Sequence, residues 1–126
     1  MIRTPNPIPV AAVVSNVDTG VSIEIPNGYW GKILDRSGNA LKKGLSVMGG
    51  VIDAPYRGDV GIILINLSTV WHEGQMVGQP AIEIKKGDKI AQIVILPYKH
   101  LDVVEVDELR DSSRGSKGYG SSDAVK

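Results

Sequence analysis

Val60-Gly61-Ile62-Ile63-Leu64-Ile65-Asn66-Leu67 is the stretch of sequence that decides the fold. It is a nearly continuous run of Ile, Leu and Val, and residues 90–96 have the same character. Runs of this kind suit strands in the centre of a sheet. Residues 21–25 and 81–85 alternate apolar and polar side chains with period two, which is typical of half-buried strands. The sequence therefore predicts an all-β protein with two central strands.

Turn-forming residues separate the predicted strands. The chain has 15 glycines and 7 prolines, and residues 26–28 and 86–88 are predicted turns. No long amphipathic helix is visible. Residues 37–43 could form one helix of about two turns, which Ser37 would cap and Gly44 would end. We therefore predict a jelly roll, sandwich or distorted β-barrel with one short helix.

Composition limits the function classes. With 126 residues, 42% of them hydrophobic, the chain suits one domain with a modest core. Zero cysteines exclude disulfides and cysteine-bound metals, and two histidines, His72 and His100, are too few and too far apart for a zinc site. The 14 basic and 14 acidic residues balance, so the overall charge gives no reason to expect nucleic acid as a partner.

The apolar pattern predicts a β domain over residues 1–109 followed by a Gly- and Ser-rich arm over residues 110–126. This polar arm is not expected to pack by itself, so it is either disordered or a mobile arm. No stretch is long enough to span a membrane, and the N-terminus lacks the apolar core of a signal peptide. We expect a cytoplasmic protein without membrane contact, or a nuclear one if the host has a nucleus.

The first candidate site is Gly50-Val51-Ile52-Asp53-Ala54-Pro55-Tyr56-Arg57-Gly58, which places an acid, an aromatic ring and a base in one turn-forming stretch. Asp53 lies between the apolar pair Val51-Ile52 and the rigid pair Ala54-Pro55. A hairpin is therefore expected to hold its carboxylate in place. We expect the chemistry to occur here.

Arg36 and Gln92 mark two further candidate sites. Arg36 and Ser37 precede a predicted helix start, where free backbone N–H groups favour phosphate, although an ordinary cap with a solvated cation has the same sequence. Gln92 lies inside the second apolar run, where an amide is costly to bury unless it is hydrogen-bonded. It could instead face solvent. Both readings stay open for each residue.

The fourth candidate lies in the arm, at residues 114–122. Its glycines allow the backbone to wrap an anion, Arg114 and Lys117 can neutralise it, and Tyr119 can stack on a flat ring. A flexible tail often has this composition as well. The arm is thus a candidate nucleotide clamp or an unstructured end.

In this order, the four clusters resemble four of the five motifs of the trimeric dUTPases, over about the last hundred residues. They read Asp35-Arg36-Ser37-Gly38-Asn39-Ala40, then residues 50–58, then Gly87-Asp88-Lys89-Ile90-Ala91-Gln92, then residues 114–121. Residues 26–31 and the pair Gly49-Gly50 look most like virus- or phage-encoded members. The resemblance implies a β jelly-roll homotrimer with active sites at subunit interfaces, which hydrolyses dUTP to dUMP and pyrophosphate with Mg²⁺.

The resemblance also implies roles around the first candidate site. Asp53 would activate the water that attacks the α-phosphorus, and Gln92 would bond a phosphate or that water. Tyr56 would lie under the deoxyribose, where it leaves no space for a 2′-hydroxyl. The strand that would pair with the edge of uracil through its backbone comprises Gly50, Val51 and Ile52.

The phosphates would be held by two groups of residues. The family's phosphate-binding motif is matched by Arg36, Ser37 and Gly38. The arm that closes over the nucleotide of another subunit is matched by Arg114, Gly115, Ser116, Lys117, Gly118, Tyr119, Gly120 and Ser121. Closure would exclude water from the phosphates. No direct protein ligand to Mg²⁺ is expected, since phosphates and water would hold the ion.

The sequence departs from the family in several places. The first motif, an Ala-Gly-Tyr-Asp-Leu type strand, has no recognisable counterpart, and Asp18 is a poor substitute for its acid. Lys117 stands where the arm normally has Gly. Residues 70–80 are longer than the usual connection. For this stretch a packed surface loop is favoured over an interaction surface formed by Trp71 and Met76.

Three functions are compatible with these observations. We favour a dUTP diphosphatase that limits uracil incorporation into DNA and supplies dUMP. A catalytically impaired dUTP-binding regulatory protein is the first alternative, because the first motif is missing. A dCTP deaminase of the same fold superfamily is the second, and the arm and the Asp53 stretch disfavour it because both follow the dUTPase pattern.

Overall fold

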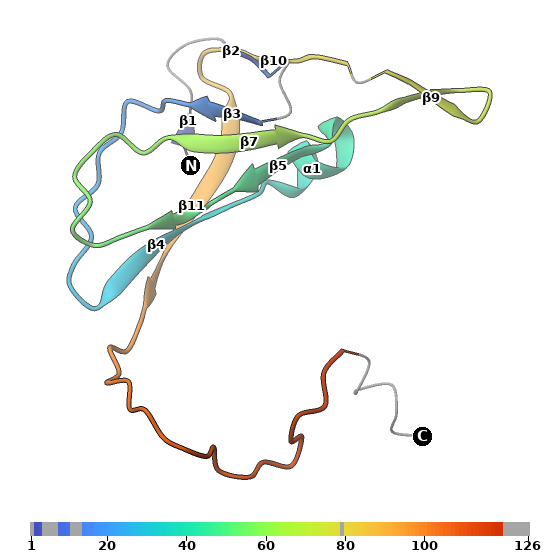
Figure 1. Cartoon of the computed structure of the whole chain (residues 1–126). Coiled ribbons are helices and arrows are strands. Elements are labelled where there is room, and N and C mark those ends of the chain that lie inside the picture. Colours follow the sequence, from blue (N-terminus) through green and yellow to red (C-terminus); the bar gives the residue numbers. More distant parts are fainter. Residues whose placement is uncertain (1, 4–7, 11–13, 79, 120–126) are drawn as a thin grey trace.

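A computed structural model describes residues 2–3, 8–10, 14–78 and 80–119 of the chain (Figure 1). In these residues the protein is mostly strands with one short helix, which confirms the predicted all-β class. In chain order the elements are β1 (Ile2–Arg3), β2 (Ile8–Val10), β3 (Val14–Val17), β4 (Tyr29–Leu34), α1 (Ser37–Lys43), β5 (Leu45–Met48), β6 (Val51–Ile52), β7 (Ile62–Asn66), β8 (Val70–His72), β9 (Gln75–Gly78), β10 (Ile82–Ile84) and β11 (Lys89–Pro97).

Two larger antiparallel sheets organise the described strands. One has the order β3-β7-β5 and the other β1-β11-β4-β6, while β10 pairs with β2 and β8 with β9. The two continuous apolar runs form β7 and β11, and each has a strand on both sides. The prediction of two central strands is therefore confirmed.

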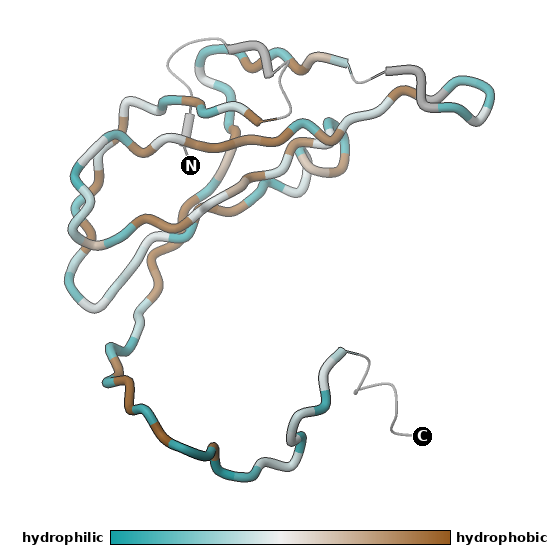
Figure 2. Tube along the Cα trace, in the orientation of Figure 1, coloured by the Kyte–Doolittle hydropathy of each residue, from teal (hydrophilic) through white to brown (hydrophobic). Residues whose placement is uncertain are grey.

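The hydrophobic core lies between the two larger sheets. Ile33 of β4 and Ile90 of β11 pack in one cluster with Ile62 and Leu64 of β7. Along β7 these two side chains are buried whereas Ile63 between them is exposed, and Figure 2 shows the apolar character of this strand. Burying each such side chain contributes about 1.5–3 kcal/mol. The sandwich thus follows from the pleat of its central strands.

One predicted strand is wrong. The pairing of residues 21–25 is limited to an isolated bridge between Ser22 and Asp59, so this segment is not a regular strand. The backbone N–H of Val60 also donates to the Val21 carbonyl at 2.8 Å. The apolar alternation still has a physical basis, since Ile25 is buried. The alternation of apolar and polar residues therefore occurs here in a segment that is not hydrogen-bonded to a neighbouring strand along its length.

Both predicted turns are confirmed. Tyr29 N–H donates to the Pro26 carbonyl at 3.2 Å, and Asp88 N–H donates to the Lys85 carbonyl at 3.0 Å. Gly28 and Gly87 each adopt a φ of 85°, a conformation that favours glycine. The second turn brings residues 87–90 next to the helix, which matters for the site below.

The helix is confirmed, but its predicted cap is wrong. Gly44 ends α1 with a φ of 64°, as predicted. At the start, Arg36 is the N-cap residue and makes no side-chain capping bond, while Ser37 already lies inside the helix. The Arg36 carbonyl accepts hydrogen bonds from Asn39 and Ala40 at 2.9 and 3.0 Å. Backbone geometry rather than the Ser37 hydroxyl therefore sets the first turn.

Strands β8 and β9 form a hairpin that extends from the body of the molecule (Figure 1). Its turn contains Glu73 and Gly74, both with positive φ (51° and 76°), as a two-residue hairpin turn requires. Residues 70–78 are therefore a strand pair and not the loop that was predicted. The side chains of Trp71 and Met76 lie outside the described part of the structure.

The chain beyond β11 curves away from the β domain in Figure 1. All of residues 94–119 are exposed, including apolar side chains such as Val103 (98%) and Leu109 (88%). Figure 2 shows these apolar residues at intervals along the curve. A single chain thus provides no cover for this segment.

Candidate functional site

Asp53 follows β6 at the start of the loop that leads to β7. The Tyr56 N–H donates to the Asp53 carbonyl at 3.1 Å and closes a turn around Ala54 and Pro55. The Ala54 side chain is buried, and its carbonyl accepts from Arg57 Nη1 at 2.6 Å. These contacts fix the backbone of the turn while the Asp53 side chain remains exposed.

The turn is not the hairpin that was predicted. Strand β6 pairs with β4, whereas β7 pairs with β3 and β5. The chain thus crosses from one large sheet to the other between β5 and β6, and returns through the Asp53 loop. The carboxylate is held where the two sheets separate.

Tyr56 is oriented by two contacts within the same loop. Its hydroxyl donates to the Asp59 carbonyl at 2.8 Å. Its ring also covers Gly58, where an added Cβ would lie 2.5 Å from the Tyr56 hydroxyl oxygen. Because 46% of the residue remains exposed, the ring offers a fixed face to a ligand.

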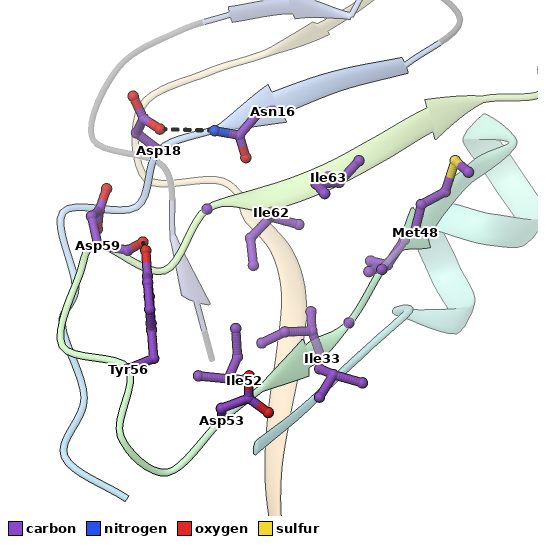
Figure 3. A pocket seen from close by; sticks show the side chains of 15 residues that line it. Asn16, Asp18, Ile33, Met48, Ile52, Asp53, Tyr56, Asp59, Ile62 and Ile63 are labelled. Carbon is purple, nitrogen blue, oxygen red and sulfur yellow. Dashed lines mark hydrogen bonds between the residues drawn. The ribbon is translucent and has the colours of Figure 1, made fainter. Parts of the chain in front are cut away.

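Asp53 and Tyr56 both line a cavity of about 450 Å³, which we call the Asp53 cavity (Figure 3). Such a volume is in the range of small-molecule sites. Three kinds of group line it: carboxyl and amide side chains, apolar side chains, and backbone. Its residues are Asn16, Asp18, Ile33, Val47, Met48, Gly49, Gly50, Val51, Ile52, Asp53, Tyr56, Asp59, Gly61, Ile62 and Ile63.

The backbone of the Asp53 cavity is available because two strands diverge there. The β5–β7 ladder ends at the pair Met48–Ile63. Gly49 then adopts a φ of 70°, and the Ile33 N–H donates to the Gly50 carbonyl across the other sheet at 2.7 Å. Gly49 and Gly50 line the concave space where β5 no longer pairs with β7. This arrangement suits the edge of a planar, hydrogen-bonding ring.

Arg36, Ser37 and Gly38 lie at a different place, around the start of α1. Arg36 lines a second cavity of about 370 Å³, which we call the Arg36 cavity. Three cationic residues and one acid contribute to its lining, namely Arg36, Lys43, Lys89 and Asp88. Positive charge beside a helix start favours an anion. Ser37 and Gly38 are exposed next to it.

Gln92 is exposed, and its side chain is hydrogen-bonded. Its Nε2 donates to the Asp35 carbonyl at 2.7 Å, so the amide is tied to the segment that carries Arg36. The Asp35 carboxylate in turn accepts from Ser46 Oγ at 3.1 Å and from the Val47 N–H. The structure therefore brings Gln92 and Arg36 into one neighbourhood.

The structure does not bring Gln92 and Asp53 together. Ile52 pairs with Gly31 and Gln92 pairs with Leu34, on opposite sides of β4. Given the spacing of strands and of residues along a strand, the Cα atoms of Ile52 and Gln92 are roughly 14 Å apart. Asp53 and Gln92 thus serve different surfaces of one chain.

The arm residues stand apart from both cavities. Arg114 Nε donates to the Lys117 carbonyl at 2.8 Å, and its Nη2 donates to the Gly118 carbonyl at 3.1 Å. These bonds curl residues 114–118 into a compact turn, and Tyr119 is fully exposed. Gly120 and Ser121 lie outside the described residues.

Sequence reasoning missed several side chains of the Asp53 cavity. Asn16, Asp18 and Asp59 line it together with Asp53. Asn16 reaches the cavity because it pairs with Ile63, a residue far away in the sequence. Local spacing carries no signal for such a pairing, and Asp18 was considered from the sequence only as a poor substitute for the acid of the missing first motif.

The described residues contain no group of three or more His, Cys, Asp or Glu side chains that could hold a metal ion. In the same residues, no helix is long and apolar enough to cross a membrane.

The fold is that of an all-β domain, and its acid-bearing loop lies at a concave cavity whose volume is in the range of small-molecule sites. The dUTPase family model matches residues 6–123, so the chain belongs to the dUTPase family. The deoxyuridine 5′-triphosphate nucleotidohydrolase of Hydrogenobaculum sp. (strain Y04AAS1) is 45% identical over 107 residues, which are 83% of this chain and 67% of that protein.

Solved structures of phage dUTPases are similar to this fold. A single-residue mutant of the Staphylococcus bacteriophage 80alpha dUTPase, solved with dUpNHpp, is 29% identical with a TM-score of 0.81, covering 96% of this chain and 83% of that chain. A mutant dUTPase of S. aureus phage phi11, which coordinates a structural Mg(II) ion, is 26% identical with a TM-score of 0.74, covering 87% of this chain and 83% of that chain.

Proposed function

We propose that the protein hydrolyses dUTP to dUMP and pyrophosphate, and so limits uracil incorporation into DNA. The observation that carries this proposal is the match to the dUTPase family over residues 6–123, which includes the Asp53 loop, the Arg36 segment, Gln92 and the arm. The activity is that of a dUTP diphosphatase. A cytoplasmic location, or the cytoplasm or nucleus of a host if the protein is viral, is part of the proposal.

The Asp53 cavity is the proposed site for the nucleoside. Backbone groups of Gly50, Val51 and Ile52, with those exposed where β5 and β7 diverge, would hydrogen-bond the edge of uracil. The ring of Tyr56, fixed by its bond to the Asp59 carbonyl, would lie under the deoxyribose. Close contact there leaves no space for a 2′-hydroxyl, so the same loop selects deoxyuridine over uridine.

Asp53 is the proposed general base. It would accept a proton from a water molecule as the water oxygen bonds to the α-phosphorus, while the bond from that phosphorus to the bridging oxygen breaks and pyrophosphate leaves. The fixed backbone of the turn supports this role, because a general base must be held within hydrogen-bond reach of the water. Gln92 would bond a phosphate oxygen or the same water.

A complete site requires residues from more than one chain. The Cα of Gln92 lies roughly 14 Å from that of Ile52 by strand spacing, and the Gln92 amide is bonded to the segment that carries Arg36, so one chain does not assemble all of these residues around one phosphate group. We propose a homotrimer in which one subunit supplies the Asp53 cavity, a second supplies Arg36, Ser37, Gly38 and Gln92, and an arm closes over the nucleotide. The exposed apolar residues beyond β11 support this assembly, because a neighbouring subunit would cover them.

Mg²⁺ is the proposed cofactor. It usually keeps several waters and binds through substrate phosphates with few protein carboxylates, so a dedicated protein cage is not needed. When bound, it would neutralise part of the triphosphate charge. This chain's own residues would contribute cationic groups to the phosphates, namely Arg36 and, from the arm, Arg114 and Lys117.

The direct test measures pyrophosphate release from dUTP, UTP, dTTP and dCTP with Mg²⁺. We expect release from dUTP to be far faster than from the other three nucleotides. Tight dUTP binding without pyrophosphate release at any Mg²⁺ concentration would instead select a regulatory dUTP-binding protein. Release of ammonia from dCTP would select a deaminase.

A further inference from the structure

Asn16 on β3 places a carboxamide at the Asp53 cavity, and no role has yet been given to it. Its register partner on β7 is Ile63, so its side chain lies on the same face of the sheet as Ile63 and next to Gly61. Its Nδ2 donates a hydrogen bond to Asp18 Oδ1 at 3.1 Å. Figure 3 shows this pair at the edge of the cavity.

Asp18 determines which end of the Asn16 amide faces the cavity. A carboxylate offers only acceptor atoms, so the NH₂ end of the amide must turn toward Asp18. The oxygen end then points to Gly61, where an added Cβ would overlap Asn16 Oδ1. A larger residue at position 61 would therefore displace the Asn16 side chain from this place. The result is a hydrogen-bond acceptor of fixed direction beside the proposed base site.

The position of Asp18 is itself fixed by neighbouring contacts. The next residue, Thr19, is buried, and its hydroxyl donates to the Val60 carbonyl at 2.7 Å. Val60 precedes Gly61. The bond from Thr19 therefore holds the end of β3 against the start of β7, close to Asn16. This bond therefore fixes the backbone beside Asp18 relative to the backbone beside Gly61.

We infer that Asn16 Oδ1 accepts a hydrogen bond from the ring N3–H of uracil, and that Asp18 is the positioning residue that keeps the amide in the accepting orientation. The inference rests on the proposed function, since it assigns a base-selecting residue to that site. Uracil has a donor at N3, whereas cytosine has a lone pair there. An acceptor of fixed direction therefore favours uracil and repels cytosine.

The experiment measures the binding of dUMP and dCMP to the full-length protein by calorimetry, separately from pyrophosphate release. For Asn16→Ala we expect dUMP binding to weaken about tenfold, as for loss of one hydrogen bond in a polar site, and dCMP binding to become tighter because the repulsion at cytosine N3 is removed. For Asp18→Asn we expect a smaller loss of preference for dUMP, because the amide can now turn over. Ser15→Ala, on the opposite face of β3, is the matched control and should bind both nucleotides as the wild type does.

Two results separate the inference from the proposed function. If the wild type releases pyrophosphate from dUTP and folded Asn16→Ala binds dUMP as tightly as the wild type, the inference is wrong and the function stands. If the wild type prefers dUMP, Asn16→Ala removes the preference, and no pyrophosphate is released, the function is wrong and the inference stands. Thermal unfolding of each variant shows whether it is folded.

Discussion

The Asp53 cavity and the proposed phosphate-binding residues are built in different ways. Around Asp53, one chain supplies the acid, the aromatic ring and the backbone, and hydrogen bonds within the loop fix them. Arg36 and Gln92 lie elsewhere on the chain, and the arm lines neither cavity. The difference supports the proposal that one folded chain prepares recognition of the nucleoside, whereas the phosphates would require assembly of several chains.

The largest expected effect is on the Asp53 side of this comparison. Asp53→Asn removes the general base while keeping the shape of the side chain, so kcat for dUTP should fall about 1,000-fold. Binding of a non-hydrolysable dUTP analogue should stay within about threefold of the wild type, because the cavity is unchanged. Asp59 lines the same cavity, and Asp59→Asn should lower kcat for dUTP by less than about tenfold. Equal kcat for Asp53→Asn and the wild type would remove Asp53 from the mechanism.

The arm should show a smaller loss that leaves the fold intact. Arg114 is exposed and bonds two carbonyls of its own arm, so Arg114→Ala should not change the melting temperature of the β domain. Loss of a charge-assisted contact to phosphate should lower kcat/KM for dUTP about 10- to 100-fold. Arg110→Ala, a cation in the same exposed segment, is the control and should keep wild-type kcat/KM. Unchanged activity in Arg114→Ala would contradict closure of the arm over the nucleotide.

Mixing two inactive variants tests directly whether the two regions come from different chains. Asp53→Asn retains Arg36, and Arg36→Ala retains Asp53. When equal amounts are unfolded and reassembled together, random trimers should regain about a quarter of wild-type activity, since half of the chains can supply each intact part. Each variant reassembled alone is the control. No recovery, in trimers shown to contain both variants, would mean that one chain completes its own site.

The smallest effects are expected from substitutions of two glycines. Their effects on the free energy of unfolding compare how tightly the two regions are packed. A Cβ on Gly50 would lie 2.6 Å from the Ile33 carbonyl oxygen, so Gly50→Ala should destabilise the protein by about 1–3 kcal/mol. A Cβ on Gly38 meets nothing within 4 Å, so Gly38→Ala should leave the free energy of unfolding unchanged or slightly higher. Denaturant unfolding measures both. A large loss of stability in Gly38→Ala would show that the start of α1 is packed as tightly as the Asp53 cavity.

Local patterns in the sequence predicted much of the fold. Strands β7 and β11, the turns at Gly28 and Gly87, and the helix that ends at Gly44 all follow from periodicity or from the conformational freedom of glycine. The predicted strand at residues 21–25 was wrong because pairing depends on a partner, which the segment itself does not specify. The Ser37 cap was wrong because a backbone carbonyl took that role.

The candidate site was predicted less completely than the fold. The Asp53 stretch was identified, but its sheet pairing was not, since β6 pairs with β4, a strand that lies well before it in the chain. Asn16 was missed altogether, because its place beside Gly61 depends on the register between β3 and β7. The roles of Arg36, Gln92 and the arm remain predictions from the resemblance. The resemblance implies active sites at subunit interfaces, which a single chain does not contain.

Asp35 connects the two regions within one chain. Its carbonyl holds the Gln92 amide, and its carboxylate holds Ser46 and Val47, which lead directly into the Asp53 cavity. Within one chain, this residue thus ties the Gln92 amide of β11 to β5 at the rim of the Asp53 cavity. A displacement of the Asp35 segment therefore reaches both regions through only two hydrogen-bonded groups.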